Sequence, residues 1–477
     1  MILDTSTPPE SPILIPHFMR GEVRIAADVE HRSRSQSSRV ATPRIILDEL
    51  VWSRHEPVPA LDLPIKEIIQ FLAELGKRLA FDHNAHLQEA LEQMTQFSTL
   101  DVRILENCYR DLASLFDRKA VIAEAEQSLG TLDVLDGWVA KNPLYPQCRI
   151  RAIPPRLVHI LAGNAPIVSP ISIVRGAISK GVHLLKLPSN DMWTATAILR
   201  TMADIDPHHP TTRSFAAVYW KGGDDAIESA LYRSQFFDKI VVWGGEGAVR
   251  HVLKYVGPGL EMLSFDPKVS ISMIGCEAFA SNAITAEVAR RAAADVIGLN
   301  QDACSASRFH YVEGSVEQVD AYCEKLVDAM GQDTRYGPGA SKLLPPRDVR
   351  EQLDMMQNLE PIFRLFGRYD GRGLVIRSEE PVSFSPSGKL VNVVRVSSLE
   401  EAVRYSTVAT QTVGVYPAAR RNSLRNALAS AGAQRIVALG EVNSGGFGGK
   451  PHDAGWPVHR FMRWVSEEGD NSGETLQ

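Results

Sequence analysis

At 477 residues the chain is too long for a single ordinary hydrophobic core, so we expect two or three domains. Hydrophobic residues make up 44% of the chain and charged residues 23%, which is typical of a soluble globular protein. The formal net charge of −6 argues against a protein that binds nucleic acid through phosphate contacts. The five cysteines include no CxxC pair, so we expect no metal site and no disulfide framework. We also expect a cytoplasmic protein, because neither a signal peptide nor a membrane span is recognisable.

The first 155 residues divide into two parts. Residues 1–45 begin with proline-rich sequence and contain a Ser/Arg segment at 31–39, which predicts a flexible N-terminal arm. Residues 46–155 carry apolar side chains at helical spacing, such as Ile65, Ile68 and Leu72. They predict a helical region that packs on the following domain.

Strands alternate with helices across residues 156–274. Apolar segments at 157–161, 182–187, 215–220 and 239–243 are separated by helical patterns at 166–179, 194–204 and 224–233. This alternation predicts right-handed βαβ units and a parallel sheet, in which ligands bind at the carboxyl ends of the strands. We therefore expect 156–274 to be a cofactor-binding domain.

Polar residues and glycines follow the predicted strands of this domain. They are Asn164, Lys186, Ser189, Gly244 and Gly245. This is the layout of a nucleotide site, although it lacks the Rossmann glycine fingerprint. Each residue also has a simpler interpretation: Asn164 as a helix cap, Lys186 as a solvated charge, and the two glycines as a turn. Another glycine-rich stretch, 445–450, is no P-loop, because Pro451 stands where Ser or Thr is needed.

A second α/β block covers residues 275–440. A helical pattern at 284–299 leads into Asn300 and then a single thiol, Cys304, in a small polar segment. A cysteine at a helix–loop junction can be a nucleophile, because backbone N–H groups stabilise its thiolate; the alternative is an inert, buried cysteine. Strand patterns follow at 309–312, 391–396, 412–416 and 435–439, with a helix at 398–406. Residues 441–477 are expected to return to the cofactor domain or to form an interface.

Four short motifs occur here in a recognisable order: Gly-Asn-Ala-Pro at 163–166, Lys186 with Ser189, the glycine turn at 244, and Asn-Gln-Asp-Ala-Cys at 300–304. Over residues 155–465 the chain resembles the aldehyde dehydrogenase superfamily, and residues 15–21 show a weaker similarity to it. Within it, the chain is similar to the long-chain acyl-CoA reductases, which include the reductase subunit of the bacterial luminescence fatty acid reductase complex. The resemblance implies two parallel-sheet α/β domains, one cofactor-binding and one catalytic, a helical N-terminal region and an oligomerisation arm.

The resemblance also implies roles for individual residues. Cys304 matches the nucleophile, Asn164 the oxyanion-hole amide, Lys186 the ribose-binding lysine, and Gly244 the turn on the nicotinamide side, with Gly245 beside it. Where aldehyde-oxidising members place the Glu that activates water, this chain has Ser264, although Asp266 remains a substitute. Where a Glu usually follows the ribose lysine, it has Ser189. Losing that carboxylate favours NADPH, with NADH as the alternative.

The function expected from these features is NADPH-dependent reduction of an acyl thioester, fatty acyl-CoA or acyl-carrier protein, to the aldehyde through a thioacyl-Cys304 intermediate. The alternatives are an aldehyde dehydrogenase that makes acids and a non-catalytic partner subunit. The resemblance further implies a homo-oligomer and an acyl-transferring or synthetase partner. His452 is expected to make a structural contact, or else to orient a substrate or donate a proton. His159 is expected in the core, and the other four cysteines in structural positions.

Overall fold

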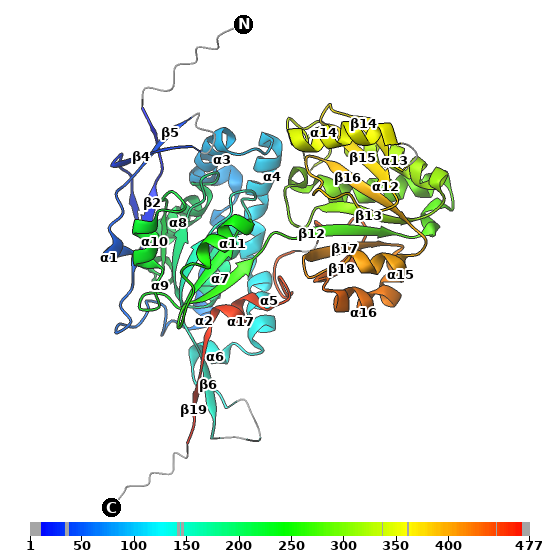
Figure 1. Cartoon of the computed structure of the whole chain (residues 1–477). Coiled ribbons are helices and arrows are strands. Elements are labelled where there is room, and N and C mark those ends of the chain that lie inside the picture. The colour runs from blue at the N-terminus through cyan, green and yellow to red at the C-terminus, as the bar shows by residue number, and fades with distance from the viewer. Residues whose placement is uncertain are drawn as a thin grey trace, which may run out of the picture. The chain divides into compact units, whose positions relative to one another are not determined.

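The computed structural model describes residues 11–33, 38–140, 144, 147–335, 337–359, 362–444 and 446–469. The chain divides into two compact units, which Figure 1 draws with their element labels. Unit 1 comprises residues 1–98, 108–266 and 446–477, and unit 2 comprises residues 99–107 and 267–445. The C-terminal segment therefore belongs to the unit that holds residues 156–266.

Unit 1 is built on a seven-stranded sheet in the order β11-β10-β7-β8-β9-β2-β3. The five strands β7 to β11 are parallel: β7 Arg156–Ile160, β8 Val182–Lys186, β9 Phe215–Val218, β10 Lys239–Trp243 and β11 Glu261–Phe265. Both faces of β8 and β9 are buried, which is why these strands are almost continuously apolar. The connecting helices are α7 Val168–Ile178, α8 Thr194–Ile205, α9 Pro210–Arg213, α10 Asp225–Leu231 and α11 Glu246–Val252. The predicted alternation of strands and helices is confirmed.

The N-terminal residues are not a flexible arm where the structure describes them. β2 His17–Met19 and β3 Glu22–Arg24 extend the large sheet, with β2 antiparallel to β9. β1 Ile13–Leu14, β5 Arg39–Thr42 and β4 Val29–Arg32 form a separate three-stranded sheet. Burial of Phe18 and a hydrogen bond from the Tyr219 N–H to His17 Nε2 (3.1 Å) fix β2 against the core. Residues 1–10 and 34–37 of the expected arm lie outside the described part.

The expected helical region contains α1 Leu47–Leu50, α2 Ile65–Arg78, α3 Ala85–Phe97, α4 Val102–Asp111, α5 Arg118–Leu129 and α6 Asp133–Asp136. Side-chain caps define two of the starts: Asn84 Oδ1 accepts the Leu87 N–H, and Asp117 accepts the N–H groups of Lys119 and Ala120. Beyond these helices β6 Arg149–Ile153 pairs antiparallel with β19 Arg463–Glu467, which follows α17 Pro457–Phe461, to form a two-stranded ribbon (Figure 1). No helix of the described chain is both long and apolar enough to cross a membrane.

Unit 2 is built on a second seven-stranded sheet, in the order β14-β15-β16-β13-β12-β17-β18. Its strands are β12 Val269–Ile274, β13 Ser307–Glu313, β14 Arg364–Arg368, β15 Gly373–Ser378, β16 Leu390–Val396, β17 Thr410–Tyr416 and β18 Arg435–Ala438. Only β14 pairs antiparallel. Its helices are α12 Asn282–Ile297, α13 Val316–Met330, α14 Arg347–Met356, α15 Leu399–Ala402 and α16 Arg421–Ala431. A core between the sheet and helices α12 and α13, including Val288, Ala292 and Leu326, holds the helix that leads to Cys304.

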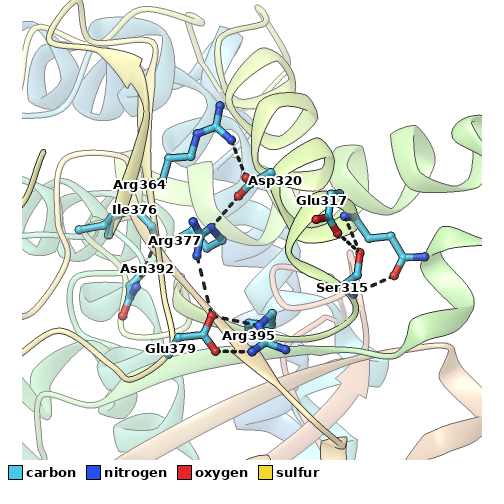
Figure 2. Close-up of polar contacts among 10 residues, drawn as sticks. Ser315, Glu317, Asp320, Arg364, Ile376, Arg377, Glu379, Asn392 and Arg395 are labelled. Atoms are coloured by element: carbon cyan, nitrogen blue, oxygen red, sulfur yellow. Dashed lines mark hydrogen bonds and ion pairs between the residues drawn. The ribbon is translucent and has the colours of Figure 1, made fainter. Parts of the chain in front are cut away.

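A chain of charges ties α13 to β14, β15 and β16 in unit 2 (Figure 2). Asp320 accepts hydrogen bonds from Arg364 and from the buried Arg377, whose Nε lies 2.6 Å from Asp320 Oδ1. Glu379 joins Arg377 to Arg395, with an Arg395–Glu379 distance of 2.6 Å. Arg377 is therefore neutralised from two sides, as a buried guanidinium requires.

Candidate active-site residues

In unit 2, α12 stops two residues earlier than its apolar pattern predicts, and the chain then reverses. Leu299, Asn300 and Gln301 have φ values of 47°, 53° and 66°. Three consecutive non-glycine residues in the left-handed region are strained, so surrounding contacts must hold them. This turn ends the helix and leads the chain into the segment that carries Cys304.

The side chain of Gln301 supplies those contacts. It is buried, donates to the carbonyls of Leu390 (2.7 Å) and Ser307 (3.2 Å), and accepts the Leu390 N–H (3.1 Å). The guanidinium of Arg308 donates to the Gln301 carbonyl at 2.9 Å. The turn is thus fixed to β13 and β16, and the position of Cys304 is set by the sheet.

Cys304 is exposed, so the alternative interpretation was wrong to expect a buried side chain. Its Sγ accepts a hydrogen bond from Gln411 Nε2 at 3.0 Å, and its carbonyl accepts one from Ser270 Oγ at 2.9 Å. Burial lowers the pKa of Arg308, and a negative charge on Asp302 or on Cys304 would oppose that effect. A thiolate at Cys304 would therefore face a cation and an amide donor.

The remaining cysteines differ in exposure. Cys323 is buried and Cys108 half-buried, and burial raises the pKa of both thiols, that of Cys108 to about 12. Cys148 is half-buried, and Cys276 is exposed. Exposure alone therefore does not distinguish Cys304 from Cys276; the amide donor on its sulfur does.

In unit 1, Asn164 lies in the loop between β7 and α7 and is half-buried. The residue at the cap position of α7 is Ile167, so Asn164 is not the capping residue. The loop is closely packed, because a Cβ atom on Gly163 would lie only 2.2 Å from Asn190 Oδ1, in the loop after β8. The ends of β7 and β8 thus bring Asn164 into the same part of unit 1 as Lys186 and Ser189.

Lys186, the last residue of β8, is only 8% exposed. Within the described residues its ammonium has no hydrogen bond or ion pair, and the rings of Tyr219 and Trp220 lie 5.8 and 6.0 Å from Nζ. Burial lowers its pKa to about 8, against the opposing charge of Glu228. A buried ammonium without an acceptor is costly, so a ligand acceptor at this position is favoured. Lys186 is thus a largely buried side chain and not the exposed charge of the simpler interpretation.

Glu228, which sequence reasoning missed, explains part of this electrostatic environment. It is buried on α10, and its carboxylate accepts hydrogen bonds from Trp220 Nε1 (3.1 Å) and the Gly223 N–H (3.2 Å) and contacts His251 Nε2. The loop after β9 is therefore held close to the Lys186 ammonium; a Cβ atom on Gly222 would lie 3.8 Å from Nζ.

Three other predicted positions follow the strands β8 and β10 of this unit. Ser189 is half-buried in the turn after β8. Gly244 and Gly245 connect β10 to α11, with Gly245 at the cap position. A Cβ atom at Gly245 would meet nothing within 4 Å, so the space beside that glycine is open.

His452 lies at the ends of β10 and β11, in the same unit as those strands. Its ring is 5.5 Å from that of Trp243 and 5.0 Å from that of Phe265. Its Nδ1 is 3.1 Å from Arg175 Nη1, and Arg175 is itself buried and paired with Glu124 at 2.7 Å. A guanidinium only donates hydrogen bonds, so Nδ1 must accept and the proton of the neutral ring lies on Nε2. His452 is therefore fixed by Arg175 at Nδ1, and its Nε2 lies 3.9 Å from Asp453 Oδ1.

The predicted core histidine is confirmed. His159 is fully buried, and its Nε2 lies 3.0 Å from His183 Nδ1. Burial lowers the pKa of His183 to about 3, so the pair is uncharged near neutral pH. Ser264 lies in β11 opposite Val242 of β10, and Asp266 follows that strand.

Each unit thus has a parallel-rich sheet with connecting helices. Solved structures share this architecture. An oxidoreductase from Marinobacter aquaeolei superposes with a TM-score of 0.71 at 14% identity, covering 95% of this chain and 98% of that one. Aldehyde dehydrogenase 21 from Physcomitrella patens gives 0.68 at 12% identity, covering 97% and 100%. The fold is that of the aldehyde dehydrogenases.

A sequence model of the family described as acyl-CoA reductase (LuxC) matches residues 60–464, most of the chain. Long-chain acyl-protein thioester reductases are similar: that of Vibrio harveyi is 27% identical and that of Photorhabdus luminescens 28%, each over 414 residues that cover 85% of this chain and 83% of the relative. The chain belongs to the acyl-CoA reductase (LuxC) family, whose members are aldehyde-forming oxidoreductases.

Proposed function

We propose that this protein reduces long-chain acyl thioesters to aldehydes through a thioacyl intermediate on Cys304, with NADPH as the reductant. Thioester reduction is the activity named for its similar relatives. The observation that carries the assignment to Cys304 is the hydrogen bonding of this exposed residue at both its sulfur and its carbonyl.

The first half-reaction transfers the acyl group. An electron pair of the Cys304 thiolate forms a bond to the thioester carbonyl carbon, and the carbonyl electrons move to oxygen. In the proposal the side-chain amide of Asn164 donates to that oxyanion, an interaction worth about 3 kcal/mol by comparison with other oxyanion holes. The carbonyl then re-forms, the bond to the donor sulfur breaks, and the donor thiol departs with a proton from solvent.

The second half-reaction releases the aldehyde. The nicotinamide cofactor, when bound, supplies the hydride that reduces the thioacyl group. Collapse of the resulting thiohemiacetal breaks the C–S bond and returns the electron pair to Cys304 Sγ, while the aldehyde leaves. The reaction therefore needs no water.

The residue at the position of the water-activating Glu supports reduction over hydrolysis. The hydroxyl of Ser264 is not a general base near neutral pH, so attack of water on the thioacyl enzyme is expected to be slow. Asp266 remains the carboxylate to test as a substitute. Replacing it with Asn is expected to leave thioester reduction intact, because that reaction needs no activated water.

The residues of unit 1 fit a nicotinamide dinucleotide. A dehydrogenase of the same fold, the Delta-pyrroline-5-carboxylate dehydrogenase of Mycobacterium tuberculosis, has been solved with NAD (TM-score 0.65, 15% identity, 98% of this chain and 92% of that chain covered). Lys186 is a buried cation whose ammonium has no hydrogen-bond acceptor among the described residues. We propose that it binds the adenosine ribose and its 2′-phosphate. Ser189 adds no negative charge there, and the carboxylate of Glu228 already accepts bonds from protein donors. This combination supports NADPH over NADH.

The test is NADPH oxidation by the purified full chain with acyl-CoA and acyl-carrier-protein donors of several chain lengths, with the aldehyde product identified. We expect NADPH oxidation that depends on the thioester. The Cys304→Ala variant should lose this activity, and the Cys276→Ala variant, changed at the other exposed cysteine, should retain it. Aldehyde oxidation without a thiol acceptor would instead support an acid-forming dehydrogenase, and no turnover with any donor would support a non-catalytic subunit.

We also propose that the protein is a homo-oligomer and receives acyl groups from a carrier or synthetase protein. The β6–β19 ribbon supports the first part, because its two strands pair only with each other apart from a single bridge between Val139 and Ile150 among the described residues. Light scattering of the full chain and of a variant with prolines in β19 tests this arrangement.

A further inference from the structure

We infer that Gln411 is a catalytic residue that stabilises the Cys304 sulfur when it is negatively charged, and that Ser270 positions the Cys304 main chain for this contact. The inference rests on the proposed function and adds two residues of β17 and β12 to it. Gln411 lies 107 positions from Cys304 in the sequence, yet its Nε2 is 3.0 Å from Sγ.

An irregularity in the sheet of unit 2 creates the contact. Val269 of β12 pairs with Thr410 of β17, but Ile271 pairs with Val413, so both Gln411 and Thr412 lie opposite Ser270. On the other side of β12, Ser270 pairs with Ser307 and Ile271 with Phe309, which makes Arg308 the extra residue. Such bulges redirect side chains and occur often beside active sites. Here the irregularity brings Gln411 into contact with Cys304, and Arg308 is close enough to interact electrostatically with it.

Ser270 links the irregular strands to the cysteine. Its hydroxyl accepts the Thr412 N–H at 3.2 Å, in place of a backbone ladder bond, and donates to the Cys304 carbonyl at 2.9 Å. The hydroxyl therefore has a fixed direction, and the Cys304 peptide is joined to β17 one residue from Gln411. Two independent hydrogen bonds thus hold the cysteine against the same strand end.

The chemistry of an amide limits what Gln411 can do. Its NH₂ group donates and does not accept a proton near neutral pH, so it is not a general base. It favours the charged form of its partner, because hydrogen bonds to ionised groups are stronger than those to neutral ones. Sulfur carries negative charge twice in the reaction: before attack on the thioester, and when the C–S bond of the thiohemiacetal breaks and its electrons return to Sγ. Gln411 acts at both points, and no proton moves to or from it.

The reactivity of the thiol tests this role without requiring turnover. Full-length protein is alkylated with iodoacetamide from pH 6 to 10, and the Cys304 and Cys276 peptides are quantified by mass spectrometry. Gln411→Met keeps a side chain of similar length but removes the donor, and Gln411→Glu keeps the shape but adds a negative charge. We expect Cys304 to react about tenfold more slowly at pH 7 in Gln411→Met, and more slowly still in Gln411→Glu.

The controls separate chemistry from folding. The alkylation rate of Cys276 is expected to stay unchanged in each variant. The alkylation rate of Cys304 is expected to stay unchanged in Gln352→Glu, which places the same charge on the exposed surface of α14. Ser270→Ala should slow acylation by acyl-CoA while cofactor binding stays unchanged. Unchanged Cys304 reactivity in both Gln411 variants, with normal Cys276 rates, would overturn the inference even if thioester reduction occurs. Absence of thioester reduction in the native protein would refute the proposed function, while the reactivity shift remains measurable.

Discussion

Replacing Lys186 with Met should make the protein more stable while it removes cofactor binding. The residue is 8% exposed and its ammonium lacks a hydrogen-bond acceptor among the described residues, so its charge is poorly compensated by the protein. Its pKa falls from 10.5 to about 8 on folding. At about 1.4 kcal/mol per pH unit this corresponds to about 3 kcal/mol of unfavourable burial. Met retains most of the buried aliphatic stem and has no charge to desolvate.

The sign of the pH dependence follows from the lowered pKa. Between about pH 8 and 10.5 the unfolded chain binds more protons at Lys186 than the folded chain does, so native stability rises with pH across that interval. The cost is fully present below pH 8. Lys186→Met should therefore raise the free energy of unfolding by up to about 3 kcal/mol at pH 7 and by much less at pH 10.

Urea denaturation of the two proteins at pH 7 and pH 10 measures this difference, and tryptophan fluorescence titration measures NADPH binding. Lys180→Met is the control, since Lys180 is also buried, at 1% exposure, but donates to the Leu135 carbonyl (3.1 Å) and to Asp136 (3.0 Å). Its loss should destabilise the protein by about 1–3 kcal/mol. A Lys186→Met protein that is less stable at pH 7 and still binds NADPH would refute the reasoning.

Three further results are expected. NADPH affinity should fall above about pH 8, by up to tenfold per pH unit, because the free Lys186 ammonium then loses its proton; a flat profile in equilibrium titrations from pH 6 to 10 would contradict this. Ser189→Glu should weaken NADPH binding by at least tenfold and leave NADH binding similar, because a carboxylate repels the 2′-phosphate; equal effects on both cofactors would show that Ser189 does not face that group. Asp320→Ala should lower the free energy of unfolding by about 3–5 kcal/mol, because it leaves the buried Arg377 without its nearest carboxylate. Arg395→Ala, in the more exposed part of the same network, should lower it by less than about 1 kcal/mol (Figure 2). Equal losses in urea denaturation would contradict the burial argument.

Several parallel strands of both units were predictable because their sequences are locally strand-forming, although β12, an interior strand of unit 2, was not predicted. The runs that became β7, β8 and β10 are short, apolar and bounded by turn residues, and the structure places them within a residue or two of the prediction. By contrast, β2 and β4 contain only three and four residues, His-Phe-Met and Val-Glu-His-Arg. They form because distant strands offer pairing partners, so composition alone predicted a flexible arm there.

The candidate site divides in the same way. The sequence indicated Lys186 and Cys304 as site residues. It did not indicate that the Lys186 ammonium lacks a hydrogen-bond acceptor, or that an amide donates to the Cys304 sulfur. Burial decides the state of Lys186, and a sheet irregularity brings Gln411 to Cys304. The sequence also showed no sign of the left-handed turn before Cys304, because this turn contains no glycine after residue 298 and is held by the side chain of Gln301.

A single-turnover experiment tests the thioacyl intermediate most directly. Native protein is mixed with a long-chain acyl-CoA in the absence of cofactor, quenched in acid, digested and analysed by mass spectrometry before and after NADPH is added. The proposed reaction predicts an acyl mass on the peptide that contains Cys304, and its loss as an equal amount of aldehyde forms. Aldehyde formation with no acyl group on Cys304, or an acylated Cys304 that NADPH does not discharge, would contradict it.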